Sequence, residues 1–505
     1  MHPSPRIPWP TPAPRHTPLD MDPQDFRRLG HALVDSVARF LGEVPSRKVT
    51  TGEAPDTIRA LINAGQSMPE AGTDAGELLR ETAHLLYDHS LFNGHPRFMG
   101  YVTSSPAPIG MLADLLAAAI NPNVGAWRLS PVATEIEAQA VRWVAEMIGY
   151  PSDTGGLFVS GGNMANMIGF FAARAKAATW DVRTSGMNPP GGQPLRVYAS
   201  AETHTWLQKA ADLSGLGTDQ LRWIPTTSDL RMDVALLRQS IAHDRAAGLR
   251  PMMVVGTAGS VSTGSVDPLV EIAELCREQG IWFHVDGAYG ALAALVPGSP
   301  PDLKGLALAD SVAVDPHKWL YAPLEAGCAL VRDRETLLNA FTYHPPYYHF
   351  GQEATNYVDF GPQNSRGFRA LKVWLALRQV GRAGYLRTIG EDMKLAQRLH
   401  ARAAEHPELE AATLGLSIAT FRYVPKELPL AGAEREEYLN KLNAELLDRI
   451  QLGGEAFVSN AVVGGRYLLR ACIVNFHTAE SDVDAIPEIV ARIGRAVDGE
   501  MRRGA

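Results

Sequence analysis

Short apolar stretches recur between residues 155 and 330, each followed by a loop and then a helical pattern, and they restrict the possible folds of this chain most. They are rich in β-branched, aromatic and small residues and lie at 157–159, 196–199, 252–255, 281–285 and 311–314. Stretches of this length and composition are typical of buried strands. Strands that alternate with helices form a mostly parallel sheet with helices on both faces, so the sequence predicts an α/β fold.

Polar residues with reactive or hydrogen-bonding side chains follow these strands. They are Asn163, His204, Thr257, Asp286 and Lys318. In an open α/β sheet, ligands bind beyond the carboxyl ends of the strands. We therefore expect these side chains to meet at one edge of the sheet and to form the functional site.

Lys318 stands at the exit of the strand at 311–314, where Asp315-Pro316 breaks the strand and opens a turn. A lysine amine in such a place can form a Schiff base with an aldehyde. Pyridoxal phosphate (PLP) is an aldehyde cofactor that uses a lysine together with an acidic partner for its pyridine nitrogen. Taken alone, a lysine after a strand is more often a surface residue.

Asp286 supplies the acidic partner, because it directly follows the apolar strand at 281–285. A carboxylate at this position pairs with a pyridinium and keeps it protonated, which makes the ring an electron sink. Ala288 is small enough to let a ring lie flat against the backbone. The alternative role for an aspartate after a strand is a helix N-cap.

A glycine turn between the strand at 157–159 and the helix expected at 164–178 is a candidate phosphate site. It contains Gly162, Asn163 and Met164. Backbone N–H groups at a glycine turn and a helix N-terminus bind phosphate oxygens. In isolation such a turn is usually only a tight bend.

Charge and composition exclude several other classes. The 505-residue chain has a formal net charge of −8 and no basic run, which argues against a nucleic-acid partner. No apolar run reaches the roughly 18–20 residues that a membrane span needs. The three cysteines, Cys276, Cys328 and Cys472, have neither metal-binding nor disulfide spacing. Without a signal pattern at the N-terminus either, we expect a cytoplasmic protein that binds no metal.

The chain is expected to have four parts. Residues 1–20 are a proline-rich, disordered tail, and residues 21–95 are a helical segment with an amphipathic helix at 26–41. Residues 96–392 form the large domain. Residues 393–505 form a small α+β domain, with strands expected at 413–423 and 467–476.

The motifs Asp286-x-Ala288 and Asp315-Pro316-His317-Lys318-Trp319 together resemble the group II PLP-dependent amino-acid decarboxylases, and among them the aromatic-L-amino-acid decarboxylases. The resemblance runs from about Met21 to the C-terminus. It implies the PLP-dependent transferase fold of type I. It also implies decarboxylation of an L-amino acid, expected to be tryptophan, tyrosine, DOPA or phenylalanine, to the amine and CO2.

The resemblance also implies roles for single residues. Lys318 would hold PLP, His204 would stack on its ring, and the phosphate would lie at Asn163 and Met164 beside Gly162. Thr257 lies in a loop that matches the family, and Asp315 and His317 would brace the lysine strand and the cofactor. Ser104 falls where a hydroxyl residue of the family meets the substrate carboxyl group.

A long aperiodic segment at 343–362 matches the mobile catalytic loop of the family, which bears a tyrosine. Tyr347 or Tyr348 would protonate the substrate Cα, and the sequence does not choose between them. Tyr101 and Trp127, with the aromatic residues of the loop, suggest an apolar pocket for an aromatic substrate. The helical segment at 21–95 would pack on the partner subunit of a homodimer, with the active site near the interface.

Three alternatives remain open at this stage. The first is an aldehyde synthase on the same scaffold, which couples decarboxylation to oxidative deamination. The second is a decarboxylase of a non-aromatic amino acid. The third is a PLP-free binding protein, against which the presence of both Asp286 and Lys318 argues.

Overall fold

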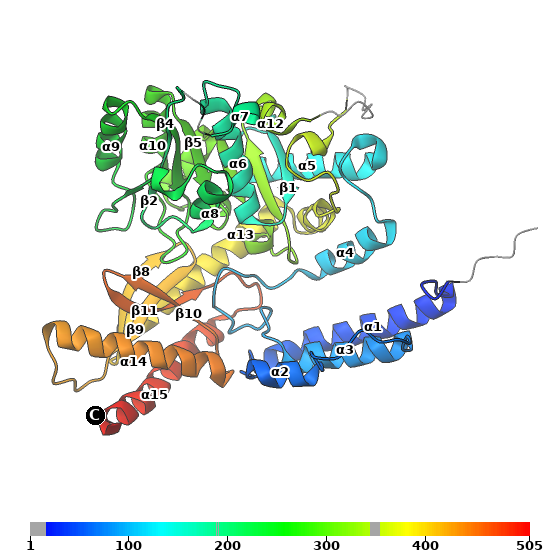
Figure 1. Cartoon of the computed structure of the whole chain (residues 1–505). Helices are drawn as coiled ribbons and strands as arrows, with labels where there is room; N and C mark the ends of the chain where they lie inside the picture. Colours follow the sequence, from blue (N-terminus) through cyan, green and yellow to red (C-terminus); the bar gives the residue numbers. More distant parts are fainter. Residues whose placement is uncertain (1–16, 188, 190, 344–353, 505) are drawn as a thin grey trace, which may run out of the picture. The chain divides into compact units, whose positions relative to one another are not determined.

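The computed structural model describes residues 17–187, 189, 191–343 and 354–504. It divides into two units (Figure 1): Met1–Arg47 with Glu53–Ser90, and Lys48–Gly52 with Leu91–Ala505. The loop residues Tyr347 and Tyr348 lie outside the described residues. The expected boundaries at residues 20, 95 and 392 remain predictions.

The first unit consists, in its described part, of the helices α1 (Pro23–Glu43), α2 (Pro55–Leu61) and α3 (Ala75–His89). Asp22 caps α1 by accepting a hydrogen bond from the backbone N–H of Gln24 at 2.8 Å, as the Asp-Pro start of the helix predicts. None of the three helices contains a buried residue. Their apolar stripes are therefore half-buried or exposed within this unit.

A seven-stranded sheet forms the centre of the second unit, in the order β1-β7-β6-β5-β4-β2-β3. Its strands are β1 (Gly155–Val159), β2 (Leu195–Ser200), β3 (Leu221–Ile224), β4 (Arg250–Thr257), β5 (Trp282–Asp286), β6 (Ser311–Val314) and β7 (Gly327–Val331). Only β7 runs antiparallel to its neighbours, β1 and β6. The predicted mostly parallel sheet with helices on both faces is confirmed.

Side chains alternate between the two faces of the sheet, as the pleat requires. On β4, Val254 packs with α9 (Val234–Ala246) and α10 (Leu269–Gln279), whereas Met253 and Val255 pack with α6 (Gly162–Ala177) and α8 (Trp206–Leu213). On β5, His284 approaches Asn166 of α6. Asp286 lies two residues after His284 and therefore belongs to the same face.

The C-terminal part of the second unit has its own hydrophobic core. An antiparallel sheet in the order β10-β11-β9-β8 packs with the helices α13 (Ala370–Glu405), α14 (Gly432–Gly453) and α15 (Glu480–Gly504). Its strands are β8 (Leu409–Gly415), β9 (Ile418–Tyr423), β10 (Ser459–Val463) and β11 (Arg466–Cys472). The single strand predicted at 413–423 is wrong, because the chain turns at Leu416 and forms the β8–β9 hairpin.

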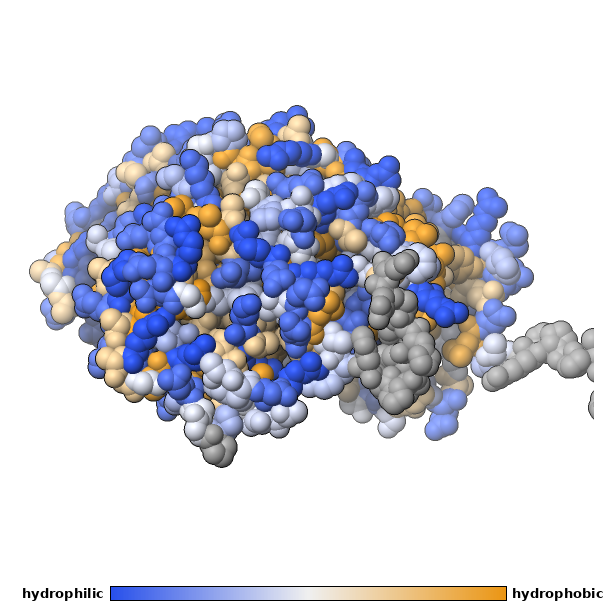
Figure 2. Space-filling model, turned by 90° about the horizontal axis from the view of Figure 1, so that it is seen from above, coloured by the Kyte–Doolittle hydropathy of each residue, from blue (hydrophilic) through white to orange (hydrophobic). Residues whose placement is uncertain are grey.

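No helix in the described ranges is long and apolar enough to cross a membrane. On the face of the molecule seen in Figure 2, hydrophobic residues form small groups among hydrophilic ones.

The second unit also contains α4 (Pro108–Ile120), in which only Gly110 and Ala113 are buried. This helix leaves Leu112, Leu115, Leu116 and Ile120 each more than half exposed.

Candidate functional site

The carboxyl ends of the parallel strands meet at one edge of the central sheet. Register pairs Thr257 at the end of β4 with Asp286 at the end of β5, and Asp286 with Ala313 of β6. Asp315 follows β6 directly, and Lys318 lies in the short helix α11 (Pro316–Trp319) that comes next. The predicted site residues of β4, β5 and β6 are therefore neighbours across the sheet.

Lys318 faces a buried carboxylate. Its Nζ lies 3.1 Å from Oδ2 of Asp315, whose side chain is 2% exposed. His317 Nε2 lies 3.7 Å from the same oxygen, and His317 Nδ1 lies 2.7 Å from the carbonyl oxygen of Ala326. Burial lowers the pKa of His317, so its ring is neutral at neutral pH. Asp315 is thus placed to balance the charge of the lysine.

Asp286 is buried at the same edge and is held through both oxygens. Its Oδ2 accepts a hydrogen bond from Trp206 Nε1 at 2.8 Å, and its Oδ1 accepts one from the backbone N–H of Ala288 at 3.2 Å. The carboxylate that would pair with a pyridinium is therefore fixed in place.

His204 lies within the electrostatic reach of both Asp286 and Lys318. Loss of solvent around the ring, opposed by the charge of Asp286 and reinforced by that of Lys318, lowers the pKa of His204. Its Nδ1 accepts a hydrogen bond from the backbone N–H of Trp206 at 3.2 Å. The neutral ring therefore carries its proton on Nε2.

The predicted phosphate turn lies against the lysine segment. A Cβ at Gly162 would meet Asp315 Oδ2 at 2.5 Å and the Cβ of Ala288 at 3.1 Å, so only glycine fits there. The helix α6 begins at Gly162, which places Asn163 and Met164 in its first turn. Backbone N–H groups of a first helical turn have no partner within the helix and are available to a phosphate.

Buried polar atoms without a protein partner test whether these residues fit PLP. Among the described residues, Asp315 Oδ1, Thr257 Oγ1 and Thr203 Oγ1 are buried and make no hydrogen bond. Buried polar atoms normally have partners, and all three atoms belong to residues at or beside this edge of the sheet. The site thus offers a lysine, a fixed carboxylate, a glycine turn and unsatisfied acceptors and donors. This combination fits PLP.

The residues predicted to contact substrate are only partly brought together. Ser104 Oγ donates to the carbonyl oxygen of His317 at 2.8 Å, which places Ser104 beside Lys318 but commits its hydroxyl hydrogen. Tyr101 is 55% exposed and has a positive φ of 52°. Trp127 donates through its Nε1 to Glu135 at 2.8 Å, and no contact joins it to Lys318 within the described ranges.

Arg470 on β11 is a candidate substrate-binding residue that the sequence reasoning missed. It is 2% exposed, and its Nη1 donates to Ser459 Oγ at 2.8 Å while its Nη2 lies 3.4 Å from the carbonyl oxygen of Tyr101. Its Nε has no partner, and no described carboxylate pairs with it. A charged residue inside the apolar stretch of β11 is the sequence signal that could have revealed it.

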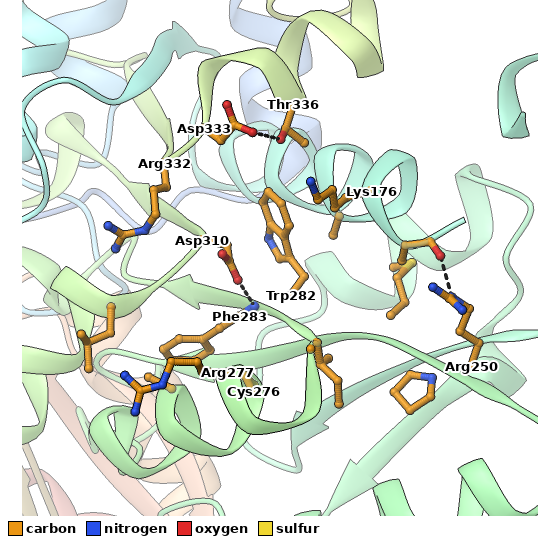
Figure 3. Close-up of a pocket in the computed structure, with 18 of the residues that line it drawn as sticks. Lys176, Arg250, Cys276, Arg277, Trp282, Phe283, Asp310, Arg332, Asp333 and Thr336 are labelled. Atoms are coloured by element: carbon orange, nitrogen blue, oxygen red, sulfur yellow. Dashed lines mark hydrogen bonds between the residues drawn. The ribbon is translucent and has the colours of Figure 1, made fainter. Parts of the chain in front are cut away.

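A cavity of about 630 Å³ opens at the opposite edge of the sheet (Figure 3). Its charged residues are Lys176, Arg250, Arg277, Asp310, Arg332 and Asp333. Arg250 and Arg332 donate to the backbone carbonyl groups of Ala177 and Ala309. Both arginines are therefore already hydrogen-bonded to the backbone of neighbouring segments. None of the predicted site residues lines this cavity.

The chain is similar to known proteins over most of its length. Residues 55–424 match the model of the pyridoxal-dependent decarboxylase conserved domain. The chain is 32% identical to an aromatic-L-amino-acid decarboxylase of Bacillus atrophaeus, over 92% of this chain and 94% of the relative. It is 28% identical to a phenylacetaldehyde synthase of a Rosa hybrid cultivar, over 92% of each chain.

The fold also matches solved structures. The crystal structure of Oryza sativa TDC with PLP and tryptamine superimposes with a TM-score of 0.87 at 28% identity. The match covers 95% of this chain and 99% of that chain. The likeness therefore extends over the central sheet and the C-terminal α+β part alike.

Proposed function

The chain belongs to the pyridoxal-dependent decarboxylase family, and on this premise we propose that it converts an aromatic L-amino acid to the amine and CO2. PLP is the cofactor of this family. The observation that carries the proposal is the convergence of Lys318, Asp286 and His204 at one edge of the sheet. The aromatic substrate class is supported by the similarity to the Bacillus decarboxylase.

Each of the three residues has a separate task. Lys318 would hold the cofactor, with its charge balanced by Asp315 at 3.1 Å. Asp286 would hold a proton on the pyridine nitrogen, and the neutral His204 would cover the ring. When bound, PLP supplies an electron sink for the electron pair that stays on the substrate Cα after CO2 leaves. Asn163 and Met164 would hold the phosphate end, and Thr257, which pairs in register with Asp286, would lie near the pyridine end.

The substrate carboxyl group needs a cationic or N–H partner. Ser104 is less suited to this task than the sequence suggests, because its hydroxyl already donates to the carbonyl oxygen of His317. Arg470 is buried, has an unsatisfied Nε, and contacts the Tyr101–Ser104 segment through the Tyr101 carbonyl oxygen. We assign the carboxyl contact to Arg470 and the protonation of Cα to Tyr347 or Tyr348.

An aldehyde synthase is the second candidate, and the similarity to the rose phenylacetaldehyde synthase favours it. In that reaction the amino acid, O2 and water give the aldehyde, CO2, ammonia and hydrogen peroxide. A single assay separates the candidates. The PLP-loaded protein is incubated under air with tryptophan, tyrosine, DOPA, phenylalanine, glutamate and cysteine sulfinate, and CO2, amine, aldehyde and peroxide are measured.

CO2 and amine in equal amounts from an aromatic substrate support the decarboxylase. Peroxide and aldehyde in place of the amine support the synthase. CO2 from the acidic substrates alone contradicts the aromatic substrate class. The Lys318→Ala variant is the control, and it should release no CO2 from any of the six substrates.

The proposal includes a cytoplasmic homodimer with the site near the subunit interface. The exposed apolar side chains of α4 support a partner subunit, and so do the helices α1, α2 and α3, which bury no residue of their own. Exposed apolar side chains gathered on one helix are typical of an interaction site. The cytoplasmic location is supported by three buried cysteines that form no disulfide.

A further inference from the structure

Trp206 connects two of the residues that would flank the cofactor ring. It is the first residue of α8 and is completely buried. Its indole N–H donates to Asp286 Oδ2 at 2.8 Å, and its backbone N–H donates to His204 Nδ1 at 3.2 Å. One residue therefore orients both the carboxylate and the imidazole.

The indole ring is itself held by a fully buried histidine. His284 contacts it edge to face, with ring centroids 5.6 Å apart and an interplanar angle of 72°. His284 Nε2 lies 2.7 Å from Asn166 Oδ1, and His284 Nδ1 lies 2.7 Å from Ser311 Oγ. With both nitrogens hydrogen-bonded, the imidazole is held in one orientation against the indole.

His284 adds no charge beside Asp286. Burial lowers its pKa to about 4, so the ring is neutral at neutral pH. The donors then follow one consistent direction: Trp282 Nε1 donates to Ser311 Oγ at 2.8 Å, Ser311 to His284, and His284 to Asn166. Trp206 thus packs against a histidine that a hydrogen-bonded network holds in one orientation.

We propose that Trp206 is a positioning residue for the cofactor, whose indole N–H fixes the orientation of the Asp286 carboxylate. This inference rests on the proposed function, in which Asp286 holds the proton on the pyridine nitrogen. Loss of the donor leaves Asp286 with the longer bond from Ala288 and weakens its pairing with the pyridinium.

The test is the affinity of the apoprotein for PLP in Trp206→Phe, measured by equilibrium dialysis. A hydrogen bond to a charged group contributes enough for a loss of affinity of about 10-fold or more. Trp374→Phe is the matched control, because its Nε1 donates to Gln139 at 2.7 Å, away from the site. The control should keep its affinity within about two-fold, and an unchanged affinity in Trp206→Phe would overturn the proposal.

A double-mutant cycle separates this role from general destabilisation. In an Asp286→Asn background, Trp206→Phe should change the affinity by less than about three-fold, because no carboxylate charge remains to stabilise. An equal loss in both backgrounds means that Trp206 acts only through packing, and overturns the inference. If Asp286→Asn alone leaves both affinity and turnover unchanged, the proposed role of Asp286 itself fails.

A variant that keeps the ring volume covers the case in which Trp206→Phe does not fold. Site-specific replacement of Trp206 by 3-benzothienyl-alanine keeps the bicyclic shape and puts sulfur in place of the N–H group. This apoprotein should still unfold cooperatively, with its melting temperature lowered only by the loss of one hydrogen bond, and its PLP affinity should fall as in Trp206→Phe. Parental affinity in this variant overturns the proposal.

Discussion

Asp286 is the residue whose charge matters most to the proposed reaction. Asp286→Asn keeps the volume and can keep the bond from Trp206, but it removes the charge that retains the pyridinium proton. We expect saturating PLP to occupy the variant still, while kcat falls about 100- to 1,000-fold. Asp310→Asn is the control, since Asp310 is a carboxylate at the opposite edge of the sheet that accepts from Phe283. Turnover of Asp286→Asn within a few-fold of the parent would contradict the role of Asp286.

Tyr347 and Tyr348 are the candidate proton donors to the substrate Cα. A positioned acid contributes roughly 100- to 10,000-fold to such a step. We predict that phenylalanine at one of these positions lowers amine formation and raises aldehyde, ammonia and peroxide under air. Tyr343→Phe is the control, because Tyr343 packs under the guanidinium of Arg183 at 3.8 Å. If both variants keep the parental rate and product ratio, the proton comes from another group, with His204 and Lys318 the next candidates.

The site residues that were predicted from the sequence and those that were missed come from different kinds of element. Lys318, Asp286 and His204 follow strands, and the parallel topology alone brings strand ends together. Trp206 reaches Asp286 from a helix 80 residues away, and its apolar body looks like ordinary core. Arg470 comes from the C-terminal sheet, whose placement no local pattern predicts. Contacts of this kind depend on tertiary packing that a single sequence does not display.

Elements were predictable where local signals agreed with the fold. The strands β1, β2, β4, β5 and β6 and the capped helix α1 carry strong local patterns, and the structure confirms them. The strands β3 and β7 were not predicted. The β8–β9 hairpin was missed because its turn places Leu416, which is not a turn residue, at a φ of 50°. Leu416 is buried and would contact a Cβ placed on Gly290 at 2.5 Å. Packing in the core therefore overrides the local preference against that conformation.

The long helix α13 is joined to the lysine segment through a buried carboxyl group. Asp392 of α13 accepts hydrogen bonds from Trp319 Nε1 at 2.9 Å and from the Tyr321 hydroxyl at 2.7 Å. Burial raises the pKa of Asp392 to about 7, although these bonds oppose the shift. The folded protein therefore keeps this proton up to about pH 7, whereas the unfolded chain loses it near the ordinary aspartate pKa of 3.8.

This difference predicts the sign of a pH effect. As pH rises from 5 to 7, the unfolded chain gains stability relative to the folded parent, because only the folded state still binds the proton. Asp392→Asn has no titrating group at this position and does not lose stability in this way. Its free energy of unfolding relative to the parent should therefore rise by up to about 2 kcal/mol between pH 5 and 7 and level off above pH 7. Urea unfolding at pH 5, 6, 7 and 8 measures it, with the exposed Asp219→Asn as the control. Parallel pH profiles for Asp392→Asn and the parent would refute the prediction.

At the scale of the whole molecule, the exposed face of α4 predicts self-association. Leu116, in the middle of that face, is 52% exposed. Leu116→Glu places a charge in the proposed interface, which should convert a dimer to a monomer at micromolar concentration and lower activity with it. Light scattering coupled to gel filtration reads the mass. Leu213→Glu, at a site that is 73% exposed on α8, should leave the mass unchanged. A parent that is already monomeric would contradict the homodimer.

The central claim is that Lys318 holds the cofactor opposite Asp286. The most direct measurement is reduction of the PLP-loaded protein with borohydride, followed by proteolysis and mass spectrometry of every lysine-containing peptide. We predict a phosphopyridoxyl group on Lys318, about one per chain, and its disappearance in Lys318→Ala while the variant keeps the parental circular dichroism spectrum. A label on another lysine, or none on a protein that releases CO2 from an aromatic amino acid, would contradict this account of the site.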